Sequence, residues 1–259
     1  MEKTEFCTVR REGRVTFVTI DRPEVMNALH PPAHEELAAV FDRFAADPEA
    51  WVAVLTGAGE RAFCAGSDLK FLARTGGDET PASGFAGLTA RFDLAKPVVA
   101  SVNGLALGGG LETVLACDLV VAAAHARFGF PEPKVGLAAL GGGLHRIVRQ
   151  IPLKLAMELI LTGRTVDAQE ARRLGLVNRV VPASELKAAT LKLVGEILDC
   201  APLALQASKA VAMDSLNVAS LEEAINRPHP AAGRMLASED AREGPRAFAE
   251  KRPPNWQGR

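Results

Sequence analysis

The stretch GLALGGGLETVLACD, residues 104–118, places three consecutive glycines directly before an apolar, helix-forming segment with one acidic residue, Glu112. Glycine costs backbone entropy inside regular structure, so a run of them in mid-chain indicates close approach of the backbone to another group. A helix that begins at these glycines presents unpaired N–H groups and positive partial charge at its N-terminus. The stretch therefore predicts a turn and helix whose first N–H groups can hold an electron-rich atom.

Short apolar segments with strand character surround this stretch and alternate with helical patterns. We expect strands at residues 14–20, 51–57, 97–104 and 118–124, and helices at residues 30–47 and 111–116. Such alternation favours parallel β-α units with buried strands. From about residue 143 the spacing of apolar residues becomes helical, at residues 153–163, 168–177, 185–199 and 203–213. The sequence thus predicts an α/β core over residues 1–200 and a helical region over residues 201–259.

Composition narrows the class of protein. Hydrophobic residues make up 48% and charged residues 24% of the 259 residues, as in ordinary soluble domains. A formal net charge of -1 gives no reason to expect nucleic acid or an anionic membrane as a partner. The four cysteines are far apart and form no CxxC pair, and the N-terminus lacks an apolar leader segment. We expect a cytoplasmic protein without a metal site or a disulfide framework.

The sequence matches two known motifs only in part, that of a dinucleotide-binding site and that of a nucleophilic serine. TGAGERAF, residues 56–63, contains G-x-G-x-x-A, but the following FCAGSD reads as a strand and a turn instead of the helix that a dinucleotide site requires. We interpret these glycines as a turn at the end of a strand. Ser67 stands in AGSDL, which is not the G-x-S-x-G of a nucleophilic serine.

Backbone N–H groups and two glutamates are the better candidates for chemistry. FCAGSDLK, residues 63–70, and LALGGGLE, residues 105–112, each follow a strand-like run and offer glycine-flanked N–H groups. Two such donors that converge would form an oxyanion hole, although the glycines also suit plain strand–helix packing. Glu112 and Glu132 would form an acid–base pair if they meet, and are otherwise a first-turn charge and a solvated loop charge.

The order of several motifs resembles the enoyl-CoA hydratase/isomerase family, also called the crotonase family. The motifs are RPEVMNAL (22–29), TGAGERAFCAGSDLK (56–70), KPVVASVNGLALGGGLETVLACDLVVA (96–122), ARFGFPEPKVGL (126–137), GGGLHRI (141–147) and LTGRTVDAQEARRLGLVNRVVP (161–182). This resemblance implies an α/β fold with a crotonase-like ββα spiral core, followed by a helical C-terminal trimerisation region. It also implies a homotrimer or a dimer of trimers.

The resemblance also assigns the site. It implies that the N–H groups of Ser67 and Gly109 bind the thioester oxygen of an acyl-CoA substrate. Glu112 would activate water for addition to C3, and Glu132 would deliver a proton to C2. The resemblance also implies that the coenzyme portion of the substrate is bound by Ala65, Gly66, Ser67, Asp68, Leu69, Lys70 and Gly109. The implied reaction is hydration of a 2-trans-enoyl-CoA, or the reverse dehydration, with no cofactor because CoA is part of the substrate.

Departures from the family pattern keep alternatives open. The loop GLAALGGGLHRI, residues 136–147, has Ala139 and Leu140 where a Pro-Gly is common, and His145 where Gln is usual. This form is closer to members of the carnitinyl-CoA dehydratase type, and His145 is either a pocket residue or a helix residue with a structural hydrogen bond. The alternatives to hydration are carnitinyl-CoA dehydration, double-bond isomerisation at one glutamate, and an RNA-binding relative without catalysis.

Two further segments carry expectations of their own. Phe248 and Lys251, near the end of the chain, resemble coenzyme contacts of the family's last helix, or else belong to a solvated tail. Residues 75–84, rich in Gly, Thr, Ser and Pro, are expected to form a mobile surface loop.

Overall fold

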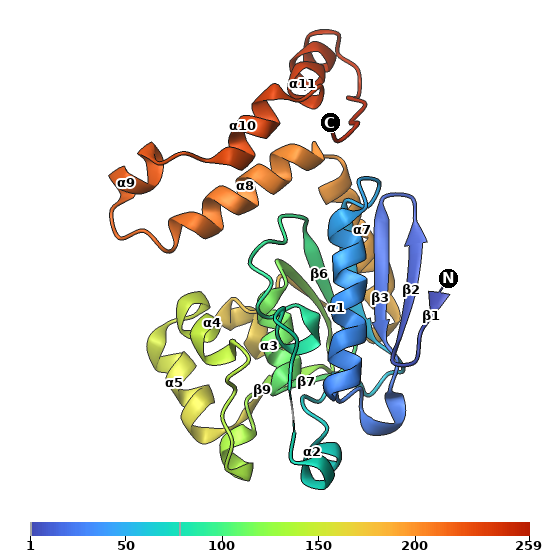
Figure 1. Cartoon of the computed structure of the whole chain (residues 1–259), viewed down its shortest axis with the longest axis vertical. Helices are drawn as coiled ribbons and strands as arrows, with labels where there is room; N and C mark the ends of the chain where they lie inside the picture. The colour runs from blue at the N-terminus through green and yellow to red at the C-terminus, as the bar shows by residue number, and fades with distance from the viewer. Residues whose placement is uncertain (1, 78) are drawn as a thin grey trace.

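Two β-sheets organise the chain (Figure 1), whose computed structural model describes residues 2–77 and 79–259. The larger sheet has the strand order β1-β2-β3-β4-β6-β8-β11. The first three strands pair antiparallel, and the pairs from β3 to β11 are parallel. The strand bounds are β1 (Glu2–Lys3), β2 (Cys7–Glu12), β3 (Val15–Ile20), β4 (Val52–Gly57), β6 (Val98–Val102), β8 (Leu119–Ala123) and β11 (Arg179–Val181). The predicted parallel β-α units are confirmed, with a short antiparallel edge added.

The smaller sheet has the order β10-β9-β7-β5 and carries the turns that matter for function. Its strands are β5 (Ala62–Cys64), β7 (Leu105–Leu107), β9 (Arg127–Gly129) and β10 (Thr165–Asp167). The strands β5, β7 and β9 are parallel to one another. Because the carboxyl ends of parallel strands lie at one edge, residues after Cys64, Leu107 and Gly129 are brought together there.

Helices cover both faces of the larger sheet. On one face α1 (Pro31–Ala46) and α3 (Gly109–Ala116) pack on Val18, Leu55 and Ala100, and on the other α7 (Leu186–Leu198) packs on Val54, Val99 and Val121. This alternation follows from the two-residue period of a strand. The other helices are α2 (Leu69–Thr75), α4 (Gly143–Gln150), α5 (Leu153–Thr162), α6 (Ala168–Leu174), α8 (Pro202–Ser215), α9 (Leu221–Asn226), α10 (Pro230–Ala237) and α11 (Asp240–Ala249), with 3-10 turns η1 (Pro23–Val25), η2 (Phe85–Gly87), η3 (Glu132–Val135) and η4 (Ala183–Glu185).

The three glycines at the start of α3 each meet a different neighbour. Gly108 has φ of +55°, and a methyl group there would lie 2.7 Å from the carboxylate of Glu132. A methyl group at Gly109 would overlap the ring of Phe85, and one at Gly110 would overlap the carbonyl oxygen of Cys64. The glycines therefore serve close packing and also bring the N-terminus of α3 against both β5 and Glu132.

The C-terminal helices α8 to α11 extend away from the two sheets as an arm (Figure 1). Lys209 of α8 connects the arm to the core, because its ammonium group donates to Asp118 at 2.8 Å and to the Lys96 carbonyl at 3.1 Å. The end of the chain is also held, since the carboxylate of Asp240 accepts from the N–H groups of Gln257 and Gly258. A division at residue 200 stays a prediction, although α8 begins close to it.

The remaining sequence predictions can be compared with these elements. The helices expected at residues 30–47, 111–116, 153–163, 168–177, 185–199 and 203–213 are confirmed. The segment TGAGERAF joins β4 to β5 without an intervening helix among the described residues, in agreement with the interpretation of its glycines as a turn after a strand. Of the loop expected at 75–84, Thr75 ends α2, Asp78 lies outside the described residues, and mobility stays a prediction. Within residues 2–77 and 79–259, no helix has the length and apolar composition needed to cross a membrane.

A pair of glycine substitutions tests the packing of α3. Gly110→Ala is expected to lower the free energy of unfolding by about 3 kcal/mol, because the added methyl group overlaps backbone and not a flexible side chain. Gly195→Ala, inside α7 where a methyl group meets nothing within 4 Å, is the control and is expected to raise it by about 0.5 kcal/mol. Urea unfolding at one protein concentration measures both. Equal stability of the two variants would contradict the close packing.

Candidate active site

Glu112 lies in the first turn of α3 and is almost wholly buried, with 4% of its surface exposed. Its carboxylate accepts a hydrogen bond from the Gly143 N–H at 2.8 Å, at the start of α4. Burial, together with the charge of the nearby Glu132, raises the pKa of Glu112 from 4.5 to about 7 against the opposing effects of Gly143 and Arg146. A carboxyl group with this pKa is divided between its acid and base forms near neutral pH, as acid–base catalysis requires.

Glu132 begins η3, directly after Pro131 and three residues after the end of β9. Its carboxylate occupies the space that a side chain at Gly108 would need, and its Oε2 atom is buried without a hydrogen-bond partner among the described residues. Burial raises the pKa of Glu132. The fold thus brings the two glutamates, which are 20 positions apart in the sequence, close to each other beside the glycine turn formed by Gly108, Gly109 and Gly110. Burial disfavours the ionised form of both carboxyl groups, and the charge of Glu132 adds to this effect at Glu112.

The backbone segments that carry Ser67 and Gly109 also approach each other at this turn. A methyl group at Gly66 would lie 3.2 Å from the Gly109 nitrogen, so the two segments run against each other. Ser67 forms a parallel bridge with Leu29 in which the Gly66 carbonyl and the Asp68 N–H make the hydrogen bonds, so the Ser67 N–H points away from Leu29. Gly109 is the first residue of α3, where the N–H has no intrahelical acceptor.

The rest of the predicted coenzyme segment, residues 65–70, leads from β5 into α2. Asp68 is the N-cap of α2, accepting from the Phe71 N–H at 3.1 Å, and forms an ion pair with Arg22 at 3.1 Å. Although burial acts to raise it, these two partners hold the pKa of Asp68 below its usual value. Leu69 and Lys70 are exposed in the first turn. Asp68 therefore shapes the backbone, while the two following side chains face solvent.

Arg146 of α4 is a site residue that the sequence reasoning missed. Its guanidinium is half-buried, donates to the Thr89 carbonyl at 2.6 Å and lies 5.6 Å from the ring centroid of Phe92. Burial lowers the pKa of Arg146, and its charge favours the ionised form of Glu112. In sequence Arg146 reads as an ordinary helix residue, because Thr89 and Glu112 reach it only through the tertiary fold.

The structure places the unusual loop and the C-terminal side chains as follows. Ala139 is buried and Leu140 is 73% exposed, while His145 lies on the exposed side of α4 and its carbonyl accepts from Arg149. Phe248 and Lys251 are exposed at the end of the arm, and Figure 1 places α11 at the opposite end of the molecule from α2. Within one chain they are therefore not brought to residues 65–70.

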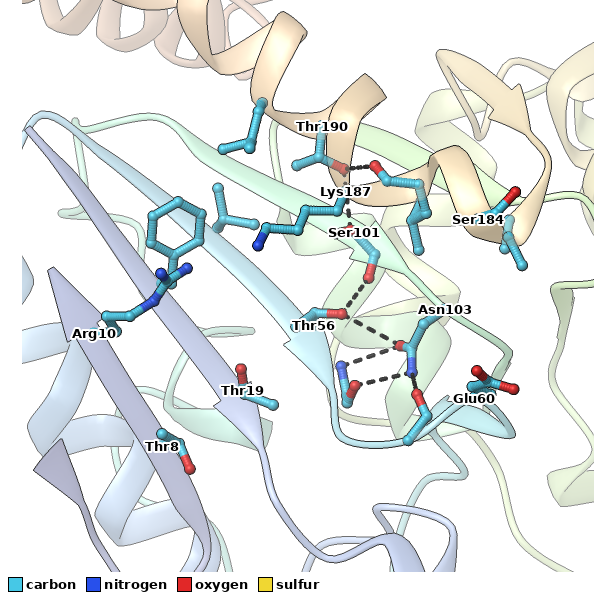
Figure 2. Close-up of a pocket in the computed structure, with 18 of the residues that line it drawn as sticks. Thr8, Arg10, Thr19, Thr56, Glu60, Ser101, Asn103, Ser184, Lys187 and Thr190 are labelled. Carbon is cyan, nitrogen blue, oxygen red and sulfur yellow. Dashed lines mark hydrogen bonds between the residues drawn. The ribbon is translucent and has the colours of Figure 1, made fainter. Parts of the chain in front are cut away.

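A cavity of about 610 Å³ lies away from these residues, on the α7 face of the larger sheet (Figure 2). Thr8, Thr19 and Thr56 lie in register across its floor, and Lys187 and Thr190 of α7 line its wall. The carboxylate pair lies on the α1 and α3 side of the sheet. The cavity therefore belongs to a different surface and takes no part in the site described here.

Among residues 2–77 and 79–259, no group of three or more His, Cys, Asp or Glu side chains is arranged to hold a metal ion. The site consists of two carboxylates with raised pKa values and backbone donors at a helix N-terminus. Such an arrangement can move protons while stabilising negative charge on an oxygen atom.

The parallel sheets, the glycine turn and the carboxylate pair define a protein of the crotonase fold. The sequence model described as enoyl-CoA hydratase/isomerase matches residues 10–259. The chain belongs to the enoyl-CoA hydratase/isomerase family.

Individual relatives agree with this placement. A carnitinyl-CoA dehydratase from Proteus mirabilis (strain HI4320) is 43% identical over 255 residues, covering 95% of this chain and 96% of that protein. The crystal structure of enoyl-CoA hydratase EchA1 from Mycobacterium marinum superposes with a TM-score of 0.92 at 41% identity, covering 98% of this chain and 99% of that one. That of a carnitinyl-CoA hydratase from Mycobacterium avium has a TM-score of 0.78 at 43% identity, covering 99% and 100%.

The raised pKa of Glu112 predicts a stability cost with a defined pH dependence. Between about pH 4.5 and 7 the folded chain binds more protons at Glu112 than the unfolded chain does, so the free energy of unfolding falls as pH rises through this range. Glu112→Gln, which is never charged, is therefore expected to be more stable than the parent by about 3 kcal/mol at pH 8, and about equal at pH 4.

Urea unfolding at the two pH values measures this difference. Glu222→Gln, on an exposed face of α9, is the matched control and is expected to change little at either pH. A Glu112→Gln variant less stable than the parent at pH 8 would refute the raised pKa.

Proposed function

We propose that this protein adds water to 2-trans-enoyl-CoA thioesters to give 3-hydroxyacyl-CoA, or catalyses the reverse dehydration. The observation that carries the proposal is the convergence of Glu112, Glu132 and the N-terminus of α3 at one turn. Family membership and relatives named hydratases and dehydratases of CoA thioesters support it. The chemistry is proton transfer, and it calls for neither a metal nor a redox cofactor.

In the proposed reaction, the thioester oxygen accepts hydrogen bonds from the N–H groups of Ser67 and Gly109. As charge moves onto this oxygen towards the enolate, fixed donors stabilise the transition state more than the ground state. Glu112 takes one proton from water while the water oxygen bonds to C3, and Glu132 gives a proton to C2. Transfer of the proton from Glu112 to Glu132 then restores the starting state. The buried, unpartnered Oε2 of Glu132 supports its role as the group that faces the substrate.

A carnitinyl-CoA dehydratase activity is the second candidate, and relatives at 43% identity with that name favour it. It uses the same proton transfers on a different acyl group. We infer that the acyl group is selected near the loop that carries Ala139 and Leu140, which follows Glu132 directly. The residues 65–70 would hold the coenzyme portion through backbone atoms and the first turn of α2.

We also propose an oligomeric state and a cellular compartment for this protein. Exposed apolar side chains lie along the arm, and they support a homotrimer or a dimer of trimers in which the arm packs on a second copy; they are Met213, Leu216, Leu221, Ile225 and Leu236. The buried thiols of Cys7, Cys64 and Cys117 are unpaired, which fits the reducing cytoplasm.

A panel of enoyl-CoA and carnitinyl-CoA thioesters tests the function. We expect loss of the conjugated thioester absorbance with 3-hydroxyacyl-CoA as the product, and a fall in kcat of about 10³-fold in Glu112→Gln and in Glu132→Gln, because each removes an acid–base group. Glu222→Gln, outside the site, is the control and should keep the parental rate.

Other results would overturn the proposal. Double-bond migration without water incorporation would identify an isomerase, and salt-sensitive RNA binding without any thioester turnover would identify a non-catalytic relative. Full hydration rates in both folded glutamate variants would refute the assignment of the acid–base pair.

A further inference from the structure

His34 lies on the apolar face of α1, in line with Leu37 and Phe41, and none of its surface is exposed. Its Nδ1 atom accepts a hydrogen bond at 3.1 Å from the N–H of Ala86, 52 positions away. Burial, with the nearby charges of His30 and Arg22, lowers the pKa of His34 to about 4. The ring is therefore neutral at neutral pH, and since Nδ1 accepts, the ring proton is on Nε2.

An imidazole at this buried position destabilises the folded chain. Its Nε2 atom is buried without a partner among the described residues, and a buried unpaired donor is destabilising. Leucine would fill a similar space without this cost, and the neighbouring positions of the face are apolar. The gain that offsets the cost is the acceptor at Nδ1, because it is the one polar atom of the ring that has a partner.

The partner of Nδ1 lies in a segment with an unusual backbone. Ala86 has φ of +54°, the left-handed region that a residue with a Cβ atom rarely adopts. Gly84 and Gly87 on either side have φ of +79° and +62°. A methyl group at Gly87 would overlap the backbone of Ala38 in α1, so the turn is pressed against the helix that carries His34. The hydrogen bond to His34 fixes the one strained position that is not glycine.

The turn from Gly84 to Gly87 also carries Phe85, whose ring reaches Gly109 at the start of α3. This ring lies against His34 with centroids 4.4 Å apart, and it also lies against Gly109, where a methyl group would overlap it. Phe85 is itself buried. A continuous line of contacts therefore runs from His34 through the turn and the Phe85 ring to the residue whose N–H is proposed to bind the thioester oxygen.

We propose that His34 is a positioning residue: by accepting from the Ala86 N–H it holds Phe85 against Gly109 and so fixes the direction of the Gly109 N–H. The inference rests on the proposed function for its effect on rate. His34 does not touch the substrate. Its loss would let the Phe85 turn relax, and small displacements of a hydrogen-bond donor in an active site have large effects on rate.

Substitutions at three positions test the proposal on hydration of crotonyl-CoA. His34→Leu, which keeps the volume and removes the acceptor, is expected to lower kcat about tenfold or more while the KM changes less than about threefold. His34→Asn can place its Oδ1 near the Nδ1 position and is expected to restore most of kcat. Phe85→Leu, which leaves the His34 bond intact but removes the ring from Gly109, is expected to lower kcat similarly.

A double-mutant cycle separates positioning from general destabilisation. Ala86→Gly removes the backbone strain that His34 opposes, so His34→Leu should lose less activity in the Ala86→Gly background than in the parent. Thr190→Val is the matched control, because Thr190 is an equally buried polar residue hydrogen-bonded to Ser101 on the α7 side of the sheet. It is expected to lower stability and leave kcat unchanged.

Hydrogen exchange supplies a readout that does not depend on turnover. Exchange of the peptide covering residues 104–112, followed by mass spectrometry, should be faster in His34→Leu and in Phe85→Leu than in the parent and in Thr190→Val. A parent enzyme that hydrates no thioester would refute the proposed function and leave this measurement valid. Parental kcat and exchange in folded His34→Leu, or in folded Phe85→Leu if the former does not fold, would overturn the inference.

Discussion

The packing of Gly110 on the carbonyl of Cys64 is the contact on which the rest of the site depends. It sets the distance between α3 and β5, and so brings the backbone after β5 alongside the backbone that opens α3. The Gly109 nitrogen then lies against Gly66, and Glu112 follows one turn later inside the protein. Neither this close approach of the two backbone segments nor the buried position of Glu112 could be reached if a side chain separated the strand from the helix.

Burial of Glu112 has opposite consequences for stability and for chemistry. In the folded chain the ionised form loses water and receives only partial compensation from the Gly143 N–H and the charge of Arg146. The same imbalance brings the pKa of Glu112 to about 7, where a carboxyl group can both accept and donate a proton. Glu132 adds to the effect because its own carboxylate lies nearby with one oxygen unpartnered. Burial of ionised Glu112 therefore destabilises the folded chain, and the apolar core beneath α3 supplies the compensating stability.

The sequence predicted those features that depend on local pattern. Strands such as Val52–Gly57 are buried on both faces and read as continuous apolar runs, and glycines next to an acid pointed to the start of α3. It did not predict β2, because CTVRRE carries charged side chains and does not read as an apolar run. It also missed Arg146 and His34, whose partners are 57 and 52 positions away. His34 did leave a signal, since a polar residue interrupts the apolar face of α1. Motif spacing located Glu132, but only the resemblance to the family indicated that it meets Glu112.

The segment from Gly84 to Phe92 connects the two missed residues and explains why both matter. At one end Phe85 packs between His34 and Gly109, on the side of the backbone donors. At the other end the Thr89 carbonyl and the Phe92 ring hold the guanidinium of Arg146, whose charge acts on Glu112. One short segment, which includes the left-handed Ala86, therefore contacts Gly109 at one end and Arg146 at the other. Because α1 contacts this segment through His34 and through the close approach of Gly87 to Ala38, the proposed geometry of the site depends on how the segment packs against α1.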